Sequence, residues 1–350
     1  MKPLLEIQKD VPLAPLTTLK IGGNARFFVV AQDETQVAEA FAFAEKESLD
    51  IFVLGGGSNV LISDTGFDGL VIHIGLRGVV SEPPAVEAGN IKLLTAQAGE
   101  DWDNFVAYCV EHDLAGVECL SGIPGFVGGT PVQNVGAYGQ EVSETIVSVR
   151  CFDQKTKEFG TLTNADCGFA YRTSIFNSTD RDRYIVLSVT FALRHGGEPK
   201  IAYKDLKEHF GETRPSLGKV RDAVLQIRRS KSMVINPDDP NSKSAGSFFK
   251  NPVVEKSKLR ELLALNENVP SFAFGNKVKI PAAWLIENAG FHKGFAIGNA
   301  GISSKHTLAL INRGNASAEE LVLLKNEIQE MVESKFGIAL QPEPVFVGFI

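Results

Sequence analysis

The stretch that decides the fold reads SGIPGFVGGT at residues 121–130 and is followed by QNVGAYG at residues 133–139. Seven glycines lie within the 24 residues 116–139, a density too high for a helix or a long strand. A second glycine turn, GGGSN at residues 55–59, follows the short apolar run at residues 51–54. Glycine lets the backbone approach a ligand closely, and backbone amides in such turns bind phosphate oxygens. Two separated glycine-rich loops therefore favour a ligand with a long pyrophosphate bridge over a purely structural turn.

The glycine turn at residues 55–59 does not complete a common nucleotide or hydrolase motif. Val60 stands where a Rossmann fingerprint needs its third glycine and where the serine-hydrolase elbow G-x-S-x-G needs its last. The pattern G-x-x-x-x-G-K-[ST] occurs nowhere in the chain, which excludes P-loop chemistry. The sequence also offers no persuasive Ser–His pair for a serine hydrolase.

The chain as a whole has an ordinary, mildly acidic composition. Its 350 residues suggest two or three domains at roughly 150 residues per domain. A formal net charge of −7 argues against a chain that coats nucleic acid or an anionic membrane. The start MKPLLE lacks the apolar core of a secretory signal, and the four cysteines form no CxxC pair. We expect a cytoplasmic monomer with free thiols, and no metal, because the histidines show no metal-ligand spacing.

Apolar periodicity and capping signals predict an α+β fold. Helices are expected after the capping box at residues 33–36 and from Asp101 to about His112. Alternating apolar residues predict strands around residues 147–151 and 185–193. The last third is predicted to be more helical, with helices at about residues 220–229, 257–265 and 282–289, and a final one after the capping box at 317–320.

Several motifs occur in an order that resembles one enzyme family. They are LGGGSN at 54–59, GIPGxxGG at 122–129, NxGAYG at 134–139, YRxSxF at 171–176, SAGSFFKNP at 244–252 and Pro-Glu at 342–343. Each motif alone is weak, but the ordered set is specific and extends from about residue 17 to residue 348. The chain is similar to the UDP-N-acetylenolpyruvoylglucosamine reductases.

The resemblance implies an FAD-binding fold of the PCMH or vanillyl-alcohol-oxidase type. Two α+β subdomains, at residues 1–77 and 78–215, would hold the flavin, and a separate α+β substrate-binding domain would follow at 216–350, with a last strand that returns to the FAD domain. The FAD is expected to be noncovalent, because the loop at 55–59 contains neither His nor Cys. The implied cofactor-binding residues are Gly55, Gly56, Gly57, Ser58, Asn59, Ser121, Gly122, Ile123, Gly125, Gly128, Gly129, Val135, Gly136 and Ala137.

The resemblance also implies the reaction. NADPH would reduce FAD, and N5 of the reduced FAD would give hydride to the methylene carbon of the enolpyruvyl ether, yielding the peptidoglycan precursor UDP-N-acetylmuramate. Charge would then develop beside the carboxylate, so the site needs a cation or acid there and a proton donor at carbon. By carry-over from the family, Arg172 would hold the carboxylate bidentately, Glu343 would polarise it as an acid, and Ser247 would donate the proton.

Six further residues are implied to contact substrate. They are Tyr138, Tyr171, Tyr203, Arg228, Lys231 and Asn251. Tyr203, within IAYKDL at 201–206, matches the loop tyrosine of the long-loop subclass, and Lys231 and Asn251 match contacts to the diphosphate. Two other classes stay open: a catalytically silent flavin or nucleotide-sugar binding protein, and a flavin oxidase that uses O₂. The presence of all three expected catalytic residues favours the reductase.

Overall fold

The computed structural model describes residues 5–82, 89–265 and 268–349 of the chain. Its contacts divide the chain into two compact units, each assembled from three segments. The first comprises Met1–Val11, Ala25–Gly57 and Phe67–Val234, and the second comprises Pro12–Asn24, Ser58–Gly66 and Ile235–Ile350. The three-part division at residues 77/78 and 215/216 stays a prediction.

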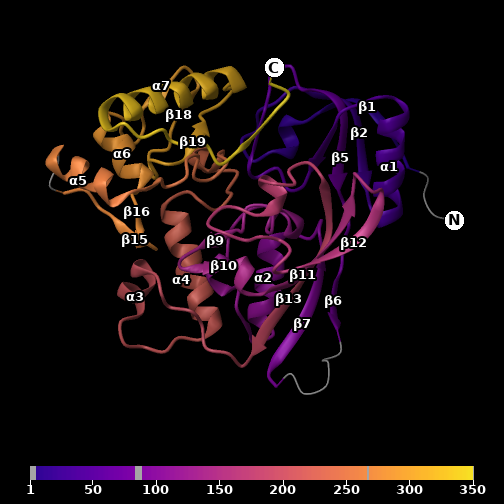
Figure 1. Ribbon diagram of the computed structural model, residues 1–350, viewed down its shortest axis with the longest axis horizontal. Coiled ribbons are helices and arrows are strands. Elements are labelled where there is room, and N and C mark those ends of the chain that lie inside the picture. The colour runs from indigo at the N-terminus through magenta and orange to yellow at the C-terminus, as the bar shows by residue number, and fades with distance from the viewer. Residues whose placement is uncertain (1–4, 83–88, 266–267, 350) are drawn as a thin grey trace. The chain divides into compact units, whose positions relative to one another are not determined.

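The first unit contains a small sheet with the strand order β1-β2-β5-β3. Both β2 (Asn24–Ala31) and β3 (Ile51–Leu54) pair in parallel with β5 (Phe67–Ile74), and β1 (Gln8–Pro12) lies at the edge. Helix α1 (Glu34–Lys46) contacts both β5 and β11, as can be followed in Figure 1. Strand β3 ends at Leu54, so the glycine turn that follows lies at the carboxyl edge of this sheet. Parallel sheets bind ligands at this edge.

A larger antiparallel sheet follows in the same unit. Its strand order is β12-β11-β13-β7-β6, and β8 pairs with the end of β13. Helix α2 (Trp102–Glu111) packs Trp102 and Phe105 onto Phe191 of the sheet, with ring centroids 6.0 and 4.9 Å apart. The strands are β6 (Val79–Glu82), β7 (Ile91–Gln97), β8 (Leu114–Ala115), β11 (Ile146–Asp153), β12 (Glu158–Thr163) and β13 (Tyr184–His195).

The rest of the first unit carries its loops and two further helices. A small hairpin of β9 (Gly136–Ala137) and β10 (Gln140–Glu141) follows the glycine-rich stretch. Helices α3 (Lys204–Phe210) and α4 (Leu217–Ser230) end the unit and pack on Cys119 through Leu206, Val220 and Val224. All four cysteines are free and buried, which confirms the expected free thiols.

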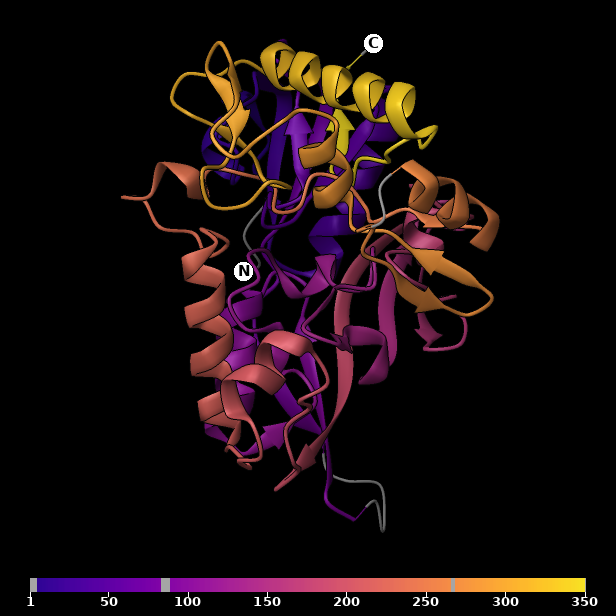
Figure 2. The same cartoon turned by 90° about the vertical axis from the view of Figure 1, so that its left-hand side faces the viewer.

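In its described residues, the second unit is built from short strands and the α-helices α5, α6 and α7. The last strand, β20 (Val345–Val347), pairs in parallel with β4 (Val60–Ile62). Figure 2 shows the long helix α7 (Ala318–Phe336) in yellow, and it contacts β17, β18 and β19. The remaining elements are β14 (Val253–Val254), α5 (Lys256–Leu265), β15 (Phe272–Phe274), β16 (Lys277–Lys279), α6 (Ala282–Asn288), β17 (Ala296–Ile297), β18 (Ala300–Ile302) and β19 (Leu310–Asn312). None of the helices in the described ranges combines the length and hydropathy needed to cross a bilayer.

Candidate functional site

The two glycine loops of the first unit meet backbone to backbone. A Cβ added to Gly56 would lie 2.7 Å from the Cα of Gly125. A side chain at residue 56 would therefore clash with the other loop and force the two loops apart. Gly122 and Gly125 have φ values of +71° and +120°, conformations that L side chains rarely adopt. The glycines therefore serve both the turn geometry and the contact between the loops.

Two glycines of these loops leave space beside the backbone. A Cβ added to Gly55 or to Gly129 would meet no described atom within 4 Å. By contrast, a Cβ on Gly128 would lie 2.6 Å from the Ala98 side chain, so Gly128 is needed for packing. The open, side-chain-free backbone at Gly55 and Gly129 fits a flat or elongated ligand such as FAD. In this arrangement, Gly55 and Gly129 would hold the cofactor by close approach.

The first turn of α2 shapes the second glycine loop. Trp102 N–H donates to Gly125 O at 3.0 Å, and its indole Nε1 donates to Leu120 O at 3.1 Å. Val127 N–H donates to Glu100 O at 2.8 Å. The amides of Val127 and Gly128 already donate to protein carbonyls, so they are not available as hydrogen-bond donors to a ligand. This part of the loop would therefore recognise a ligand through the shape of its backbone.

His73 lies between the two loops, a position that the sequence did not reveal. Its ring stacks on Phe126, with centroids 5.9 Å apart, and hydrogen-bonds to the Gly55 backbone. The Arg77 guanidinium lies 4.8 Å from the centre of the same Phe126 ring. Burial and the nearby charge of Arg77 lower the pKa of His73 from its usual value, against the Gly55 hydrogen bond. His73 is therefore neutral at pH 7.

Arg172 lies beside the hairpin that carries the residues predicted near the flavin. Its Nη2 donates to Gly136 O at 2.8 Å, and its own carbonyl accepts from Asn177 Nδ2 at 3.2 Å. The backbone of Arg172 is left-handed, with φ 53°. Its guanidinium also lies 5.8 Å from the centre of the Tyr171 ring. The structure thus brings Arg172, Tyr171 and Gly136 together, and their roles toward substrate and flavin stay predictions.

Tyr138 and Tyr203 are in edge-to-face contact, with ring centroids 5.5 Å apart and planes at 85°. Burial raises the pKa of Tyr138 to about 12, although Arg228 opposes the shift. Arg228 is only 7% exposed and donates to the carbonyls of Gly122 and Met233, at 3.2 and 2.7 Å. The guanidinium of Arg228 is thus hydrogen-bonded to backbone carbonyls of the protein. A contact between Arg228 and the substrate stays a prediction.

Lys231 lies at the C-terminal end of α4, where the helix dipole favours a cation. Its Nζ is 3.1 Å from Asp205 Oδ2, and Asp205 follows Tyr203 by two residues in the chain. Both side chains of this ion pair are partly exposed, so solvent screens it. An anionic ligand such as a diphosphate could therefore compete with Asp205 for Lys231.

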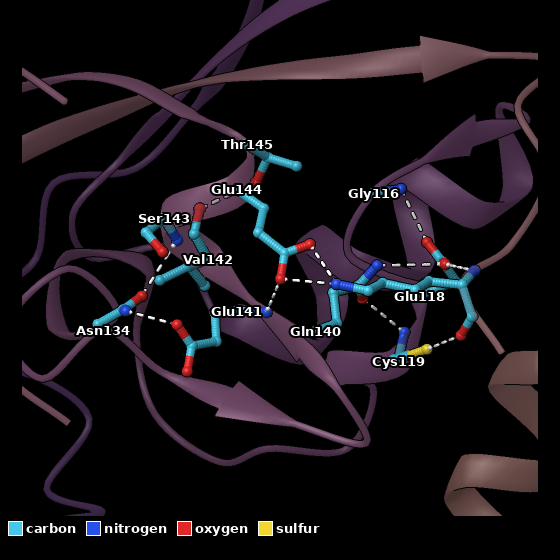
Figure 3. A network of polar contacts seen from close by, with 11 residues as sticks. Gly116, Glu118, Cys119, Asn134, Gln140, Glu141, Val142, Ser143, Glu144 and Thr145 are labelled. Atoms are coloured by element: carbon cyan, nitrogen blue, oxygen red, sulfur yellow. Dashed lines mark hydrogen bonds and ion pairs between the residues drawn. The ribbon is translucent and has the colours of Figure 1, made fainter. Parts of the chain in front are cut away.

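Glu118 is the centre of a buried polar network that no local sequence pattern predicts (Figure 3). The residue is 1% exposed, and its carboxylate accepts the N–H groups of Gly116 and Lys200, each at 2.8 Å. Gln140 donates to the same carboxylate at 3.2 Å and accepts from Cys119 N–H at 2.9 Å. The network fixes the start of the segment that leads to Tyr203. The buried hydroxyl of Ser121 joins it by donating to Glu118 O at 2.7 Å.

The second unit brings Ser247 and Glu343 onto neighbouring backbone segments. Glu343 N–H donates to Phe248 O at 2.9 Å, next to Ser247 in the chain. Asn59 Nδ2 donates to Glu343 O at 3.1 Å, and Asn59 O accepts Val345 N–H at 2.9 Å. The end of the first glycine turn therefore helps to position Glu343.

Asn251, predicted to contact diphosphate, also caps a helix. Its Oδ1 accepts Ala282 N–H at the start of α6, at 2.8 Å. The cap fixes the side-chain amide, whose Nδ2 is the group suited to donate to a phosphate oxygen.

Comparison with known proteins identifies the family. Residues 238–347 match the family model "UDP-N-acetylenolpyruvoylglucosamine reductase, C-terminal domain", and residues 25–159 match "FAD binding domain". The chain is 43% identical to the UDP-N-acetylenolpyruvoylglucosamine reductase of Thermobifida fusca, with 97% of this chain and 98% of that protein covered. It is 45% identical to the enzyme of that name from Saccharopolyspora erythraea, with 96% and 94% covered. The chain belongs to the UDP-N-acetylenolpyruvoylglucosamine reductase family.

A solved member of the reductase family has the same fold. The crystal structure of the Thermus caldophilus reductase matches 98% of this chain with a TM-score of 0.67 and 23% sequence identity. Together with the FAD-binding match, this likeness confirms the predicted fold class, and family membership confirms FAD as the cofactor. The roles of individual residues stay predictions.

Proposed function

We propose that this chain reduces the enolpyruvyl ether of UDP-N-acetylenolpyruvoylglucosamine to UDP-N-acetylmuramate, a step in peptidoglycan precursor synthesis. The observation that carries the proposal is the match to reductases along nearly the whole of both chains. The chemistry that FAD supplies when bound is hydride transfer from NADPH to the methylene carbon of the ether.

The proposed role of Arg172 is to bind the carboxylate of the substrate. A guanidinium stays charged and can donate two parallel hydrogen bonds to a carboxylate. The Gly136 carbonyl holds one end of the Arg172 side chain, which fixes its orientation before substrate arrives. Such a preset cation stabilises the negative charge that develops when hydride reaches the neighbouring carbon.

Ser247 and Glu343 are proposed to supply the acid chemistry. Glu343 would share a proton with the substrate carboxylate, and Ser247 would donate a proton to the carbon beside it. Their backbone register, fixed by the Glu343–Phe248 hydrogen bond, supports a joint role. Water or a neighbouring cation must offset the low acidity of a serine hydroxyl.

The contact residues are proposed to divide by ligand. Gly55, Gly56, Gly57, Ser121, Gly122, Gly125 and Gly129 would border the FAD, and Tyr203, Lys231 and Asn251 would border the UDP-sugar. The meeting of Gly56 with Gly125 and the open faces at Gly55 and Gly129 support the first group.

We also propose that the protein is a cytoplasmic monomer whose partners are small molecules. Four free, buried cysteines support a reducing compartment. The net charge of −7 favours small-molecule partners over nucleic acid.

Stopped-flow kinetics of the two half-reactions test the proposal. NADPH should bleach the flavin absorbance of the purified holoenzyme, and the enolpyruvyl UDP-sugar should restore it without oxygen. Ser247→Ala should keep flavin reduction nearly intact and slow reoxidation at least a hundredfold, the usual contribution of general acid–base catalysis being about 10²–10⁴. The matched control Ser230→Ala, at an exposed serine, should behave as wild type. Rapid reoxidation by air with no response to the UDP-sugar would indicate an oxidase instead.

A further inference from the structure

An ion pair between α2 and α4 reaches the second glycine loop. Asp103 faces Arg221, with Oδ1–Nη1 and Oδ2–Nη2 distances of 2.6 and 3.0 Å. This is the bidentate geometry in which arginine and carboxylate bind most strongly. Asp103 Oδ1 also accepts the Gly122 N–H, at 2.5 Å. One carboxylate therefore ties both helices to the start of the loop.

The carbonyl side of Gly122 is held from the same helix. Arg228 Nε donates to Gly122 O at 3.2 Å, and Arg228 lies seven residues after Arg221 on α4. A spacing of seven places both side chains on one face of the helix. Leu225, between them, has its Cδ2 2.7 Å from where a Cβ on Gly122 would be. Asp103 thus accepts the Gly122 N–H, Arg228 donates to the Gly122 carbonyl, and the apolar side chain of Leu225 packs over the Gly122 Cα.

The Asp103 carboxylate is suited to this task. Burial would raise its pKa, but the hydrogen bonds from Arg221 and the Gly122 amide outweigh burial and lower the pKa below its usual value. The side chains of Asp103 and Arg221 are 33% and 17% exposed, so the pair is better shielded from solvent than a typical surface pair. Asp103 therefore stays ionised through the neutral range.

We propose that Asp103 and Arg221 are positioning residues for FAD. They hold the Gly122 peptide in its left-handed conformation, from which the loop passes to Gly125 and its contact with Gly56. The proposal rests on the proposed function, because it takes this loop as FAD-binding. Since Asp103 occupies the Gly122 N–H, the pair acts through the shape of the loop and needs no contact with the cofactor.

FAD release from the holoenzyme tests this inference. Free FAD fluoresces more strongly than bound FAD, so its release after dilution can be followed directly. Asp103→Ala should release FAD roughly tenfold faster, since it removes a charge-assisted hydrogen bond and its ion pair. Asp103→Asn, which keeps an acceptor for Gly122, and Arg221→Lys, which keeps the charge, should both show smaller increases.

The matched control is the Asp153–Arg183 pair. It is also multiply bonded, with an Arg183 Nη2–Asp153 Oδ2 distance of 2.7 Å, but it joins β11 to the residue before β13. Among the described residues, no hydrogen bond or ion pair of this pair involves the glycine loops. Asp153→Asn should lower the melting temperature of the protein while leaving the FAD release rate unchanged.

The outcomes separate the two proposals. Wild-type release from Asp103→Ala, or release from Asp153→Asn as fast as from Asp103→Ala, would overturn the positioning role. If Asp103→Ala does not fold, wild-type release from both Asp103→Asn and Arg221→Lys overturns it. A wild-type protein that carries no flavin would refute the proposed function, whereas faster release confined to the Asp103 and Arg221 variants supports both.

Discussion

His73 places a titratable ring beside both glycine loops. It hydrogen-bonds to the Gly55 backbone and stacks on Phe126, and the charge of Arg77 lies close to the same Phe126 ring. Protonation would put a second positive charge next to Arg77 in a partly buried place. Because the pKa of His73 is lowered in the folded protein, the folded state resists this proton more than the unfolded state does.

This coupling predicts that acid destabilises the protein partly through His73. Below pH 6.5 the unfolded chain binds a proton that folded His73 still excludes, so stability falls as pH falls, by at most about 1.4 kcal/mol per pH unit. The contribution of neutral His73 to the free energy of unfolding is fully present above pH 6.5, the ordinary pKa of histidine. Thermal unfolding between pH 5 and 8 should show a shallower acid limb for His73→Gln than for wild type. His195→Gln, at an exposed histidine, is the control and should keep the wild-type slope.

Residue types with a local pattern could be predicted from the sequence, and residues with distant partners could not. The glycine loops stand out because glycine density is visible along the chain, whereas their contact at Gly56 and Gly125 is revealed only by the structure. Asp103 lies 118 residues from Arg221, and Glu118 lies 82 residues from Lys200. No local spacing links such pairs, and only the fold reveals that their charges are satisfied.

At the scale of elements, the start of α7 has two sets of acceptors. Ser317 Oγ accepts Glu320 N–H at 3.0 Å, and the Glu320 carboxylate accepts Ser317 N–H at 2.9 Å, which confirms the predicted capping box. Asp64, from a distant segment, accepts the N–H groups of Ala318 and Glu319 at 2.8 and 3.1 Å. Asp64 and the capping box together satisfy donors that a helix leaves open at its start.

Removal of either acceptor should weaken the second unit. Ser317→Ala and Asp64→Ala are each expected to lower the free energy of unfolding by about 1 kcal/mol. The melting temperature should fall by about 2–4 °C per kcal/mol. The control Asp68→Ala removes a partner of Arg26 from an exposed ion pair and should change stability little. Differential scanning calorimetry of the three variants would contradict the capping role if Asp68→Ala caused the largest loss.

Helices with several buried apolar residues on one face were predictable, and elements without such a pattern were not. The helices expected at 220–229 and 282–289 are present at Leu217–Ser230 and Ala282–Asn288. Helix α3 was missed because Leu206 is its single buried residue, so it has no apolar stripe. The strands of the second unit have two or three residues each, too few for an alternating pattern to be recognised.

At the scale of the molecule, the second unit depends on two segments from early in the chain. Leu19, Ile21 and Leu61 are buried in the same core cluster as the helices after residue 280. Thr18 Oγ1 donates to Ser244 O at 2.6 Å, and Asn312 Nδ2 donates to Leu19 O at 3.0 Å. The unit therefore cannot complete its core from residues 235–350 alone.

A single early leucine should consequently control the stability of the C-terminal helices. Leu61→Ala, at a side chain with no exposed surface, is expected to destabilise the second unit by about 2–5 kcal/mol. Leu323→Ala, on α7 and 48% exposed, is the matched control and should have a small effect. Hydrogen exchange should show faster exchange of α7 amides in Leu61→Ala than in the control. Equal protection of α7 in both variants would refute this dependence.

The pairing of β4 with β20 also sets an order of events during synthesis. A ribosome that adds about 5–20 residues per second makes Val60 roughly 15–60 seconds before Val345, its partner in the parallel pair. Throughout that interval the nascent chain carries Leu19, Ile21 and Leu61 without the core that buries them. The second unit can therefore complete the β4–β20 pair, and the core around these early residues, only after Val345 has been made.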